Sequence, residues 1–157
     1  MTQLNRSLKL TRGFRSLEEE AMLNLVRTVD RTQIAFTRLF REHGITAQQY
    51  NVLRILKGAG EPLPCLEIAE RMITVVPAIT GLIDRLEKAE LITRERSHED
   101  RRVVYVALST KGGRTLRALD KPLNALHQQL LGHMSEKELK QLIKLTEKAR
   151  QNAEDSA

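Results

Sequence analysis

One stretch of the chain, residues 74–112, constrains the fold more than any other. Its apolar residues first recur every three or four positions, which predicts a helix from Val75 to Ala89 with one buried face. Two short strands are then expected, Leu91–Arg96 and Val103–Leu108, joined by the charged turn Ser97–Arg102. A helix followed by a two-stranded hairpin is therefore the centre of the predicted fold.

The side of this helix opposite its apolar stripe carries short side chains. Pro77, Ala78 and Thr80 would let the backbone approach a partner closely. The hairpin that follows has arginines at its tip, Arg101 and Arg102. A helix with a small-residue face beside an arginine-tipped hairpin suits a nucleic-acid duplex, with the helix in the major groove and arginine in the minor groove.

A shorter helix is expected just before, from Cys65 to Met72, with Thr74 as the N-cap of the helix that follows. Pro77 would then fall in the first turn of that helix, where proline is tolerated. A short helix, a tight turn and a second helix form a helix-turn-helix, and the hairpin after it makes the winged version.

Capping boxes, in which a hydroxyl residue stands three positions before Glu or Gln, mark other helix starts at Ser16, Thr46 and Ser135. The first of these helices is expected to reach about His43 and to end at Gly44. Long amphipathic helices are therefore expected at both ends of the chain.

These elements predict a mainly α, α+β winged-helix fold. Residues 1–15 form a basic arm and residues 16–157 a single domain. Its winged helix-turn-helix core covers about 46–110, and the flanking helices cover about 16–43 and 111–153. Because these flanking helices are longer than a winged core needs, they most simply pack against each other and against a second copy. We therefore expect a homodimer.

Composition narrows the choice of partner. The net charge is +6 and the sequence pI is about 9.8, which suits a phosphate backbone or an anionic membrane surface. Aromatic residues make up only 3% of the chain, which argues against a base-stacking platform for single strands. No apolar run approaches a membrane span, and the single cysteine fits a reducing compartment. We therefore expect a cytoplasmic protein without a membrane partner.

The chain contains the segments 82–88 (LIDRLEK), 91–92 (LI), 100–102 (DRR) and 108–112 (LSTKG). Their order and spacing resemble those of the multiple antibiotic resistance regulator (MarR) family of bacterial transcription factors. The resemblance extends over about residues 17–149. It implies a dimeric, ligand-responsive repressor whose two winged lobes each read half of a pseudo-palindromic operator in double-stranded DNA.

The resemblance also gives Asp100 and Arg102 a role. In the family the wing arginine enters the minor groove and the aspartate two positions earlier holds its side chain in line. A planar guanidinium suits a narrow, electronegative groove, and a nearby carboxylate reduces the rotamer entropy lost on docking. The alternative for Arg102 is a solvated hairpin arginine paired with a neighbouring acid.

Other contacts with DNA follow from charge and position. Arg94 and Arg101 are expected to contact phosphates. Arg85 is expected either to contact phosphate or to pair with Asp84 or Glu87. The complete set of residues expected at the DNA is Thr74, Pro77, Ala78, Thr80, Arg85, Arg94, Asp100, Arg101 and Arg102.

The sequence departs from the family pattern at two positions. Glu90 stands where relatives usually place a glycine between helix and strand. If that position needs a positive φ, glutamate there costs about 1–2 kcal/mol, and otherwise the turn takes another shape. Gly81 replaces a larger polar residue, often arginine, which removes a direct base contact from that position.

Small-molecule binding is expected only from the resemblance. The family holds lipophilic or phenolic anions in a crevice between the dimer helices and the winged lobe. We assign no ligand residues, no cofactor and no metal.

Alternative functions rest on single residues or on the fold. Cys65 follows a proline at a helix start, where the helix dipole could lower its pKa and favour a redox or catalytic role; simple packing is the other interpretation. No histidine base or oxyanion motif accompanies it, so no enzyme is expected.

His127 and His133 do not share a helix face, which leaves His43 with Glu42 as the metal-site alternative. A winged-helix module that binds protein instead of DNA is the last alternative.

Overall fold

The computed structural model describes residues 2–96 and 103–154, and helices dominate it as the sequence predicts. None of the helices in these ranges is both long and apolar enough to cross a membrane. The elements in order are α1 (Gln3–Ser7), α2 (Leu17–Glu42), α3 (Ala47–Ala59), β1 (Leu63–Pro64), α4 (Cys65–Glu70), α5 (Ile79–Lys88), β2 (Ile92–Arg96), β3 (Val104–Leu108), α6 (Thr110–Leu131) and α7 (Glu136–Glu154).

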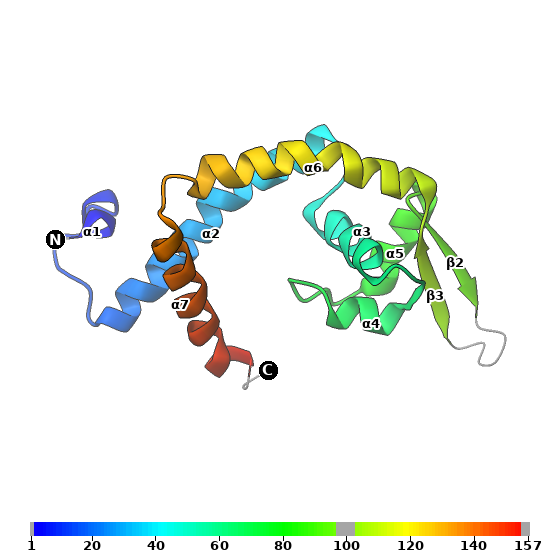
Figure 1. The fold of residues 1–157 in the computed structure, drawn as a ribbon. Helices are drawn as coiled ribbons and strands as arrows, with labels where there is room; N and C mark the ends of the chain where they lie inside the picture. The colour runs from blue at the N-terminus through cyan, green and yellow to red at the C-terminus, as the bar shows by residue number, and fades with distance from the viewer. Residues whose placement is uncertain (1, 97–102, 155–157) are drawn as a thin grey trace.

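The molecule has two parts. Helices α2 and α6 lie side by side as a long rod, with α7 and both chain termini at one end (Figure 1). The other end carries the compact unit formed by α3, β1, α4, α5, β2 and β3, which we call the winged lobe. The predicted winged helix-turn-helix between long terminal helices is therefore present.

The sheet of the winged lobe has three antiparallel strands in the order β1-β3-β2. The wing hairpin pairs Ile92 with Leu108 at its base and Arg96 with Val104 at the end of its described part. Strand β1 was not predicted from the sequence, because a segment of only two residues shows no alternation. Its Pro64 lies on a sheet edge, where a missing N–H is tolerated.

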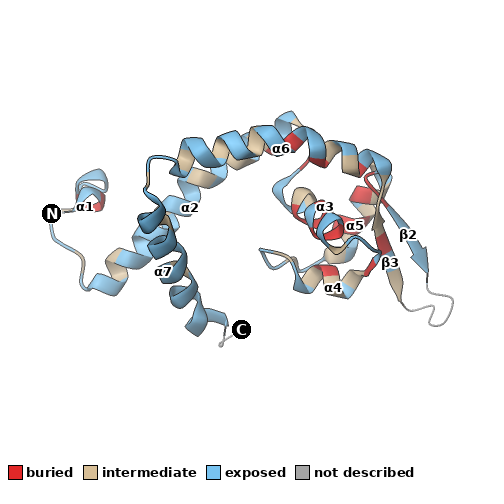
Figure 2. Cartoon of the chain, in the orientation of Figure 1, coloured by how far each residue is buried: buried red, intermediate tan, exposed pale blue. Residues whose placement is uncertain are grey.

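The hydrophobic core lies in the winged lobe and at the adjoining part of the rod (Figure 2). The predicted apolar stripe of α5, the second helix of the helix-turn-helix and called the recognition helix below, is confirmed, because Leu82, Ile83 and Leu86 are fully buried. The largest buried side chains are Leu53, Ile68, Leu82, Ile83, Leu86, Leu119, Val52 and Val106.

The start of the recognition helix was predicted wrongly. Helix α5 begins at Ile79, with Ala78 rather than Thr74 as its N-cap. Pro77 explains the difference, since the residue before a proline is driven away from the helical region. The turn of Pro77 and Ala78 therefore precedes α5, and the connection between α4 and α5 is longer than expected. Helix α4 also ends two residues early, at Glu70.

Two of the predicted capping boxes are present. The Thr46 hydroxyl accepts from Gln49 N–H at 3.2 Å while the Gln49 amide oxygen accepts from Thr46 N–H at 2.9 Å. Ser135 and Glu138 make the same exchange. At the first helix the Ser16 hydroxyl accepts from Glu19 N–H at 3.2 Å as predicted, but the Glu19 carboxylate accepts from Arg15 N–H, so only half of the box is present.

Candidate nucleic-acid interface

Helix α5 presents its polar side to solvent because its apolar side is fixed in the core. It packs against α3, α4 and β2, while Pro77, Ala78, Thr80 and Arg85 at and before its first turns are exposed. The N-cap Ala78 has no side chain that can accept a hydrogen bond. The first-turn N–H groups of α5 are therefore available to an external acceptor such as a phosphate oxygen.

Arg94 is placed differently from the sequence prediction of a phosphate contact. From β2 its Nη1 donates to Asp84 Oδ1 at 2.6 Å, and its Nη2 donates to Glu87 Oε2. These two bonds hold the strand of the wing against α5. The hydrogen bond to Glu87 is the main cause that raises the pKa of the Arg94 guanidinium, so Arg94 stays charged. Arg94 is thus a clamp between wing and recognition helix.

Sequence analysis missed this clamp although a signal was available. Asp84 and Glu87 are three residues apart and therefore share a helix face. The sequence prediction pairs them only with Arg85. The structure leaves Arg85 exposed, and no ion pair joins it to another residue within 2–96 and 103–154. Of the two alternatives for Arg85, the internal pair is wrong, and the phosphate contact stays a prediction.

A tight joint connects the end of α5 to the wing and to α6. Glu90 has a φ of +60°, so the turn adopts the left-handed conformation where relatives usually place a glycine. The Ser109 hydroxyl donates to the Glu90 carbonyl at 2.7 Å and accepts from Gly112 N–H at 2.9 Å. Ser109 N–H also donates to the Leu91 carbonyl at 3.2 Å. Lys111 pairs with the Glu90 carboxylate at 3.3 Å.

Gly112 is required by close approach rather than by a positive φ. A Cβ atom at this position would lie 2.2 Å from the Leu91 carbonyl oxygen. The first turn of α6 can therefore touch the backbone between α5 and β2 only if residue 112 has no side chain. This contact makes the start of α6 part of the winged lobe.

Three predicted DNA-contacting residues, Asp100, Arg101 and Arg102, lie outside the described residues. The strands that lead to them are described up to Arg96 and from Val104. The predicted roles of these wing residues stay predictions.

The alternative sites on cysteine and histidine gain no support. Burial raises the pKa of the Cys65 thiol, so the suggested lowering by a helix dipole is wrong. Cys65 packs against the core, as the simple interpretation holds. The His43 ring bonds to the Leu39 carbonyl at 2.9 Å, and His127 packs on Phe36 with ring centroids 5.7 Å apart. In the described ranges no cluster of His, Cys, Asp or Glu is arranged to hold a metal ion.

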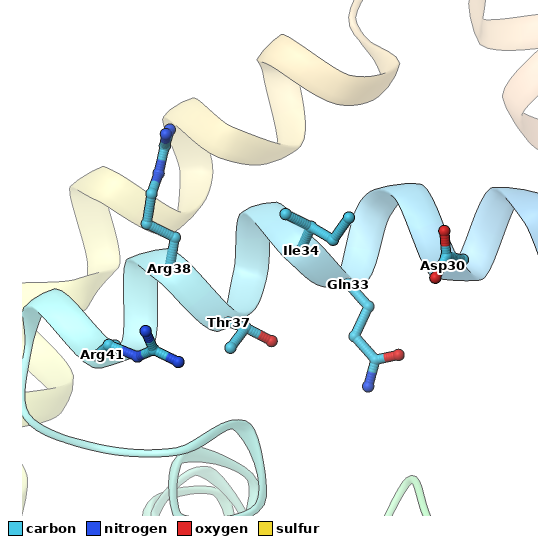
Figure 3. A pocket seen from close by; sticks show the side chains of 6 residues that line it. All are labelled: Asp30, Gln33, Ile34, Thr37, Arg38 and Arg41. Carbon is cyan, nitrogen blue, oxygen red and sulfur yellow. The ribbon is translucent and has the colours of Figure 1, made fainter.

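An open hollow of about 460 Å³ lies along α2. The side chains that line it project from this one helix (Figure 3) and are Asp30, Gln33, Ile34, Thr37, Arg38 and Arg41. Arg38 and Arg41 add positive charge to its wall. Because a single helix lines it, the hollow becomes enclosed only when another surface covers it.

Comparison with known proteins agrees with this geometry. Residues 45–104 match the model of the MarR family. The chain is 32% identical over 138 residues to the HTH-type transcriptional repressor MdtR of Bacillus subtilis, covering 88% of each chain. It is 43% identical to a MarR transcription factor of Planctomyces limnophilus in a crystal structure, with a TM-score of 0.67 over 86% of this chain and 98% of the other.

A third likeness extends to the fold alone. Bordetella bronchiseptica BpsR is 22% identical with a TM-score of 0.78, over 88% of this chain and 99% of the other. The DNA binding of BpsR is regulated by 6-hydroxynicotinic acid.

The fold and the exposed face of α5 define a winged helix-turn-helix DNA-binding protein. The similarity to MdtR and to the Planctomyces protein extends across almost the whole chain. The chain belongs to the MarR family of transcriptional regulators.

Proposed function

We propose that this protein is a cytoplasmic homodimeric repressor that binds a pseudo-palindromic operator and is released from it by a small aromatic anion. The observation that carries the proposal is α5, whose N-terminus has no side-chain cap and whose first turns expose short side chains. Pro77, Ala78 and Thr80 approach base edges in the major groove, and Thr74 and Arg85 bind phosphates on either side.

The wing supplies the remaining contacts. Arg102 enters the minor groove with Asp100 holding its side chain, and Arg101 binds a phosphate. Arg94 takes no part in binding directly, since both its Asp84 and Glu87 bonds are internal. It fixes the angle between α5 and the wing, so that both elements meet the duplex together.

The amount of exposed surface supports the dimer. The single chain exposes 12152 Å², whereas a compact monomer of 17.9 kDa exposes about 8,000 Å². Most of the exposed large apolar side chains lie away from the winged lobe. The exposed large apolar residues of this region are Leu8, Leu17, Met22, Leu23, Leu25, Val26, Val29, Ile34, Leu131, Leu142, Ile143 and Leu145. A second copy covering them would place two recognition helices on one face of the DNA.

The hollow along α2 supports an anionic effector. Arg41 suits a carboxylate or phenolate, and Ile34 suits the face of an aromatic ring. Arg38, which pairs with Glu42 at 3.9 Å, can exchange this partner for the ligand. The compound that regulates BpsR is an aromatic acid and has this chemistry. A ligand there would change how the winged lobe sits relative to the rod, and hence the separation of the two recognition helices. That separation must match half-sites about one helical turn apart.

The proposal is tested by selecting a duplex from a random pool and measuring its binding by fluorescence anisotropy at several salt concentrations. Arg102→Ala should weaken binding by about 1–3 kcal/mol. Arg150→Ala, which removes an exposed arginine on α7 paired with Glu154, serves as the control and should leave affinity unchanged.

Failure to select any sequence, with equal weak binding by all three proteins, would contradict operator recognition. Binding of a protein partner that is insensitive to Arg102 and to salt would instead favour the protein-binding winged-helix module.

The effector is tested on the same duplex with 6-hydroxynicotinic acid and related aromatic acids. An active compound should weaken operator binding by wild-type protein, and Arg38→Ala or Arg41→Ala should reduce this effect. A compound that binds tightly but leaves operator affinity unchanged would contradict the release mechanism, because coupling between sites is reciprocal.

A further inference from the structure

The exposed large apolar side chains fall into two groups. One group lies on α2, α7 and the neighbouring ends of the rod, where the proposed dimer covers it. The other lies on the winged lobe, where the dimer contact does not reach, and consists of Leu66, Ile73, Val75 and Tyr105. The most exposed of these are Val75 at 91% and Ile73 at 78%. Both belong to the connection between α4 and α5, which Figure 2 shows as mainly exposed.

This connection is held at both ends. The buried Asn51 side chain on α3 accepts a hydrogen bond from Ile73 N–H at 2.8 Å. At the other end Val76 packs against the core. Because the chain is fixed on both sides of it, Val75 is presented outward by a segment that is already ordered. An apolar side chain is thus exposed to water, which is unfavourable in free energy until a partner surface covers it.

The position of Val75 points to the DNA. It lies four residues before the first residue of α5, so its Cα is at most about 14 Å from that of Ile79. In a helix-turn-helix the first turn of the second helix is the part that reaches base edges. Because base pairs follow one another at about 3.4 Å, Val75 is at most about four base-pair steps from the first residue of α5.

The charges around the connection favour a nucleic acid as the surface that covers it. Arg85 is exposed without an ion pair among the described residues, and Arg71 extends from the end of α4 although it pairs with Glu67. These cations would flank an apolar contact with phosphates on both sides. Within the major groove the one apolar group that base edges offer is the C5-methyl group of thymine.

We propose that Val75, supported by Ile73, recognises the methyl group of a thymine in each operator half-site. The inference rests on the proposed function and adds a specificity-determining contact to it. It adds a branched apolar side chain before the first turn of α5, in which Gly81 has no side chain.

The test replaces operator thymines by uracil, one position at a time in both half-sites. Uracil keeps the hydrogen-bonding edge and lacks only the methyl group. A protein that recognises the base through hydrogen bonds alone therefore binds the thymine and uracil duplexes equally. At the recognised position, wild-type affinity should fall by about fourfold per half-site, the factor expected for one methyl group returned to water.

The second arm combines this change with Val75→Ala in a double-mutant cycle. Val75→Ala should weaken binding to the thymine duplex and should respond less than twofold to uracil at the same position. Leu66→Ala is the matched control, since Leu66 is also exposed on this lobe but lies on α4. It should keep the full response to uracil. Thermal unfolding of both variants checks that they fold, which is expected for exposed positions.

Each outcome decides one question. If wild type binds thymine and uracil duplexes equally at every position, no methyl group is recognised and the inference is wrong. If Val75→Ala keeps the response to uracil, a different residue reads the methyl group, and Val75 is free for another partner such as a protein. If wild type selects no thymine duplex at all, operator recognition itself fails, which the first binding curve reveals.

Discussion

At Glu90 the backbone adopts φ +60° with a residue that has a β-carbon. This conformation costs a non-glycine residue about 1–2 kcal/mol, whereas glycine accepts it freely. We expect Glu90→Gly to be about 1 kcal/mol more stable than Glu90→Ala, because both variants lose the Lys111 pair and only one relieves the backbone. Urea unfolding of the two proteins measures the difference. Equal stabilities would mean that the left-handed turn carries no strain.

Two neighbouring glycines offer a sharper comparison. Gly112→Ala would place its Cβ 2.2 Å from the Leu91 carbonyl oxygen and should destabilise the protein by about 1–3 kcal/mol. At Gly113 the nearest atoms to a new Cβ are side-chain atoms at 3.7 and 4.0 Å. Gly113→Ala should therefore stabilise α6 by up to about 1 kcal/mol. Thermal unfolding that shifted in the same direction for both would contradict the close contact at residue 112.

Residue-level features were predictable where local chemistry decides them. At Glu90 the family pattern left a positive φ and a different turn shape open, and the structure has the positive φ. The Thr46 and Ser135 caps followed from spacing alone. The partner of Arg94 did not follow, because the distance from β2 to α5 is set by tertiary packing. Sequence spacing shows that Asp84 and Glu87 share a face, but it does not show which cation reaches them.

At the scale of elements, substitution of Arg94 tests whether this residue joins the wing to α5 or contacts a phosphate of the DNA. Arg94→Ala should weaken operator binding by about 1 kcal/mol through loss of the α5–wing angle, while leaving the salt dependence unchanged. Arg85→Ala is the matched comparison on the exposed face of α5. It should reduce the slope of log K against log salt by about 0.9 per protomer.

The reverse result would restore the sequence prediction for Arg94, a phosphate contact. A lower salt slope for Arg94→Ala would make it a phosphate contact that exchanges its internal partners for DNA. Arg94→Lys offers a second check, because lysine keeps the charge but cannot donate to Asp84 and Glu87 through one planar fork.

Elements were predicted well where periodicity extends over several turns. Helix α2 and both wing strands lie within two residues of their expected bounds, and α3 begins where its capping box predicts. The start of α5 was wrong because the apolar pattern continues upstream through Val75 and Val76, while Pro77 prevents the backbone from following it. Strand β1 was not predicted, since β3, with which it pairs through Leu63 and Val106, is remote in sequence.

At the scale of the whole molecule, the apolar face of α2 should decide assembly. Val26→Glu would bury a carboxylate twice in a symmetric interface and should weaken the dimer by roughly 100-fold or more. Ile73→Glu makes the same kind of change on the winged lobe and should leave the dimer intact. Sedimentation velocity over a concentration series separates the two. A Val26→Glu protein that stays dimeric at the wild-type concentration would place the interface elsewhere.

The contact at Gly112 has a mechanical consequence. It joins the first turn of α6 to the backbone between α5 and β2, so we expect these parts to turn together. With 22 residues, α6 is a lever of about 33 Å. A rotation of about 5° around its far end displaces the near end by about 3 Å, which is the length of one hydrogen bond. An angular change of this size is thus enough to take the base contacts proposed for the recognition helix out of register.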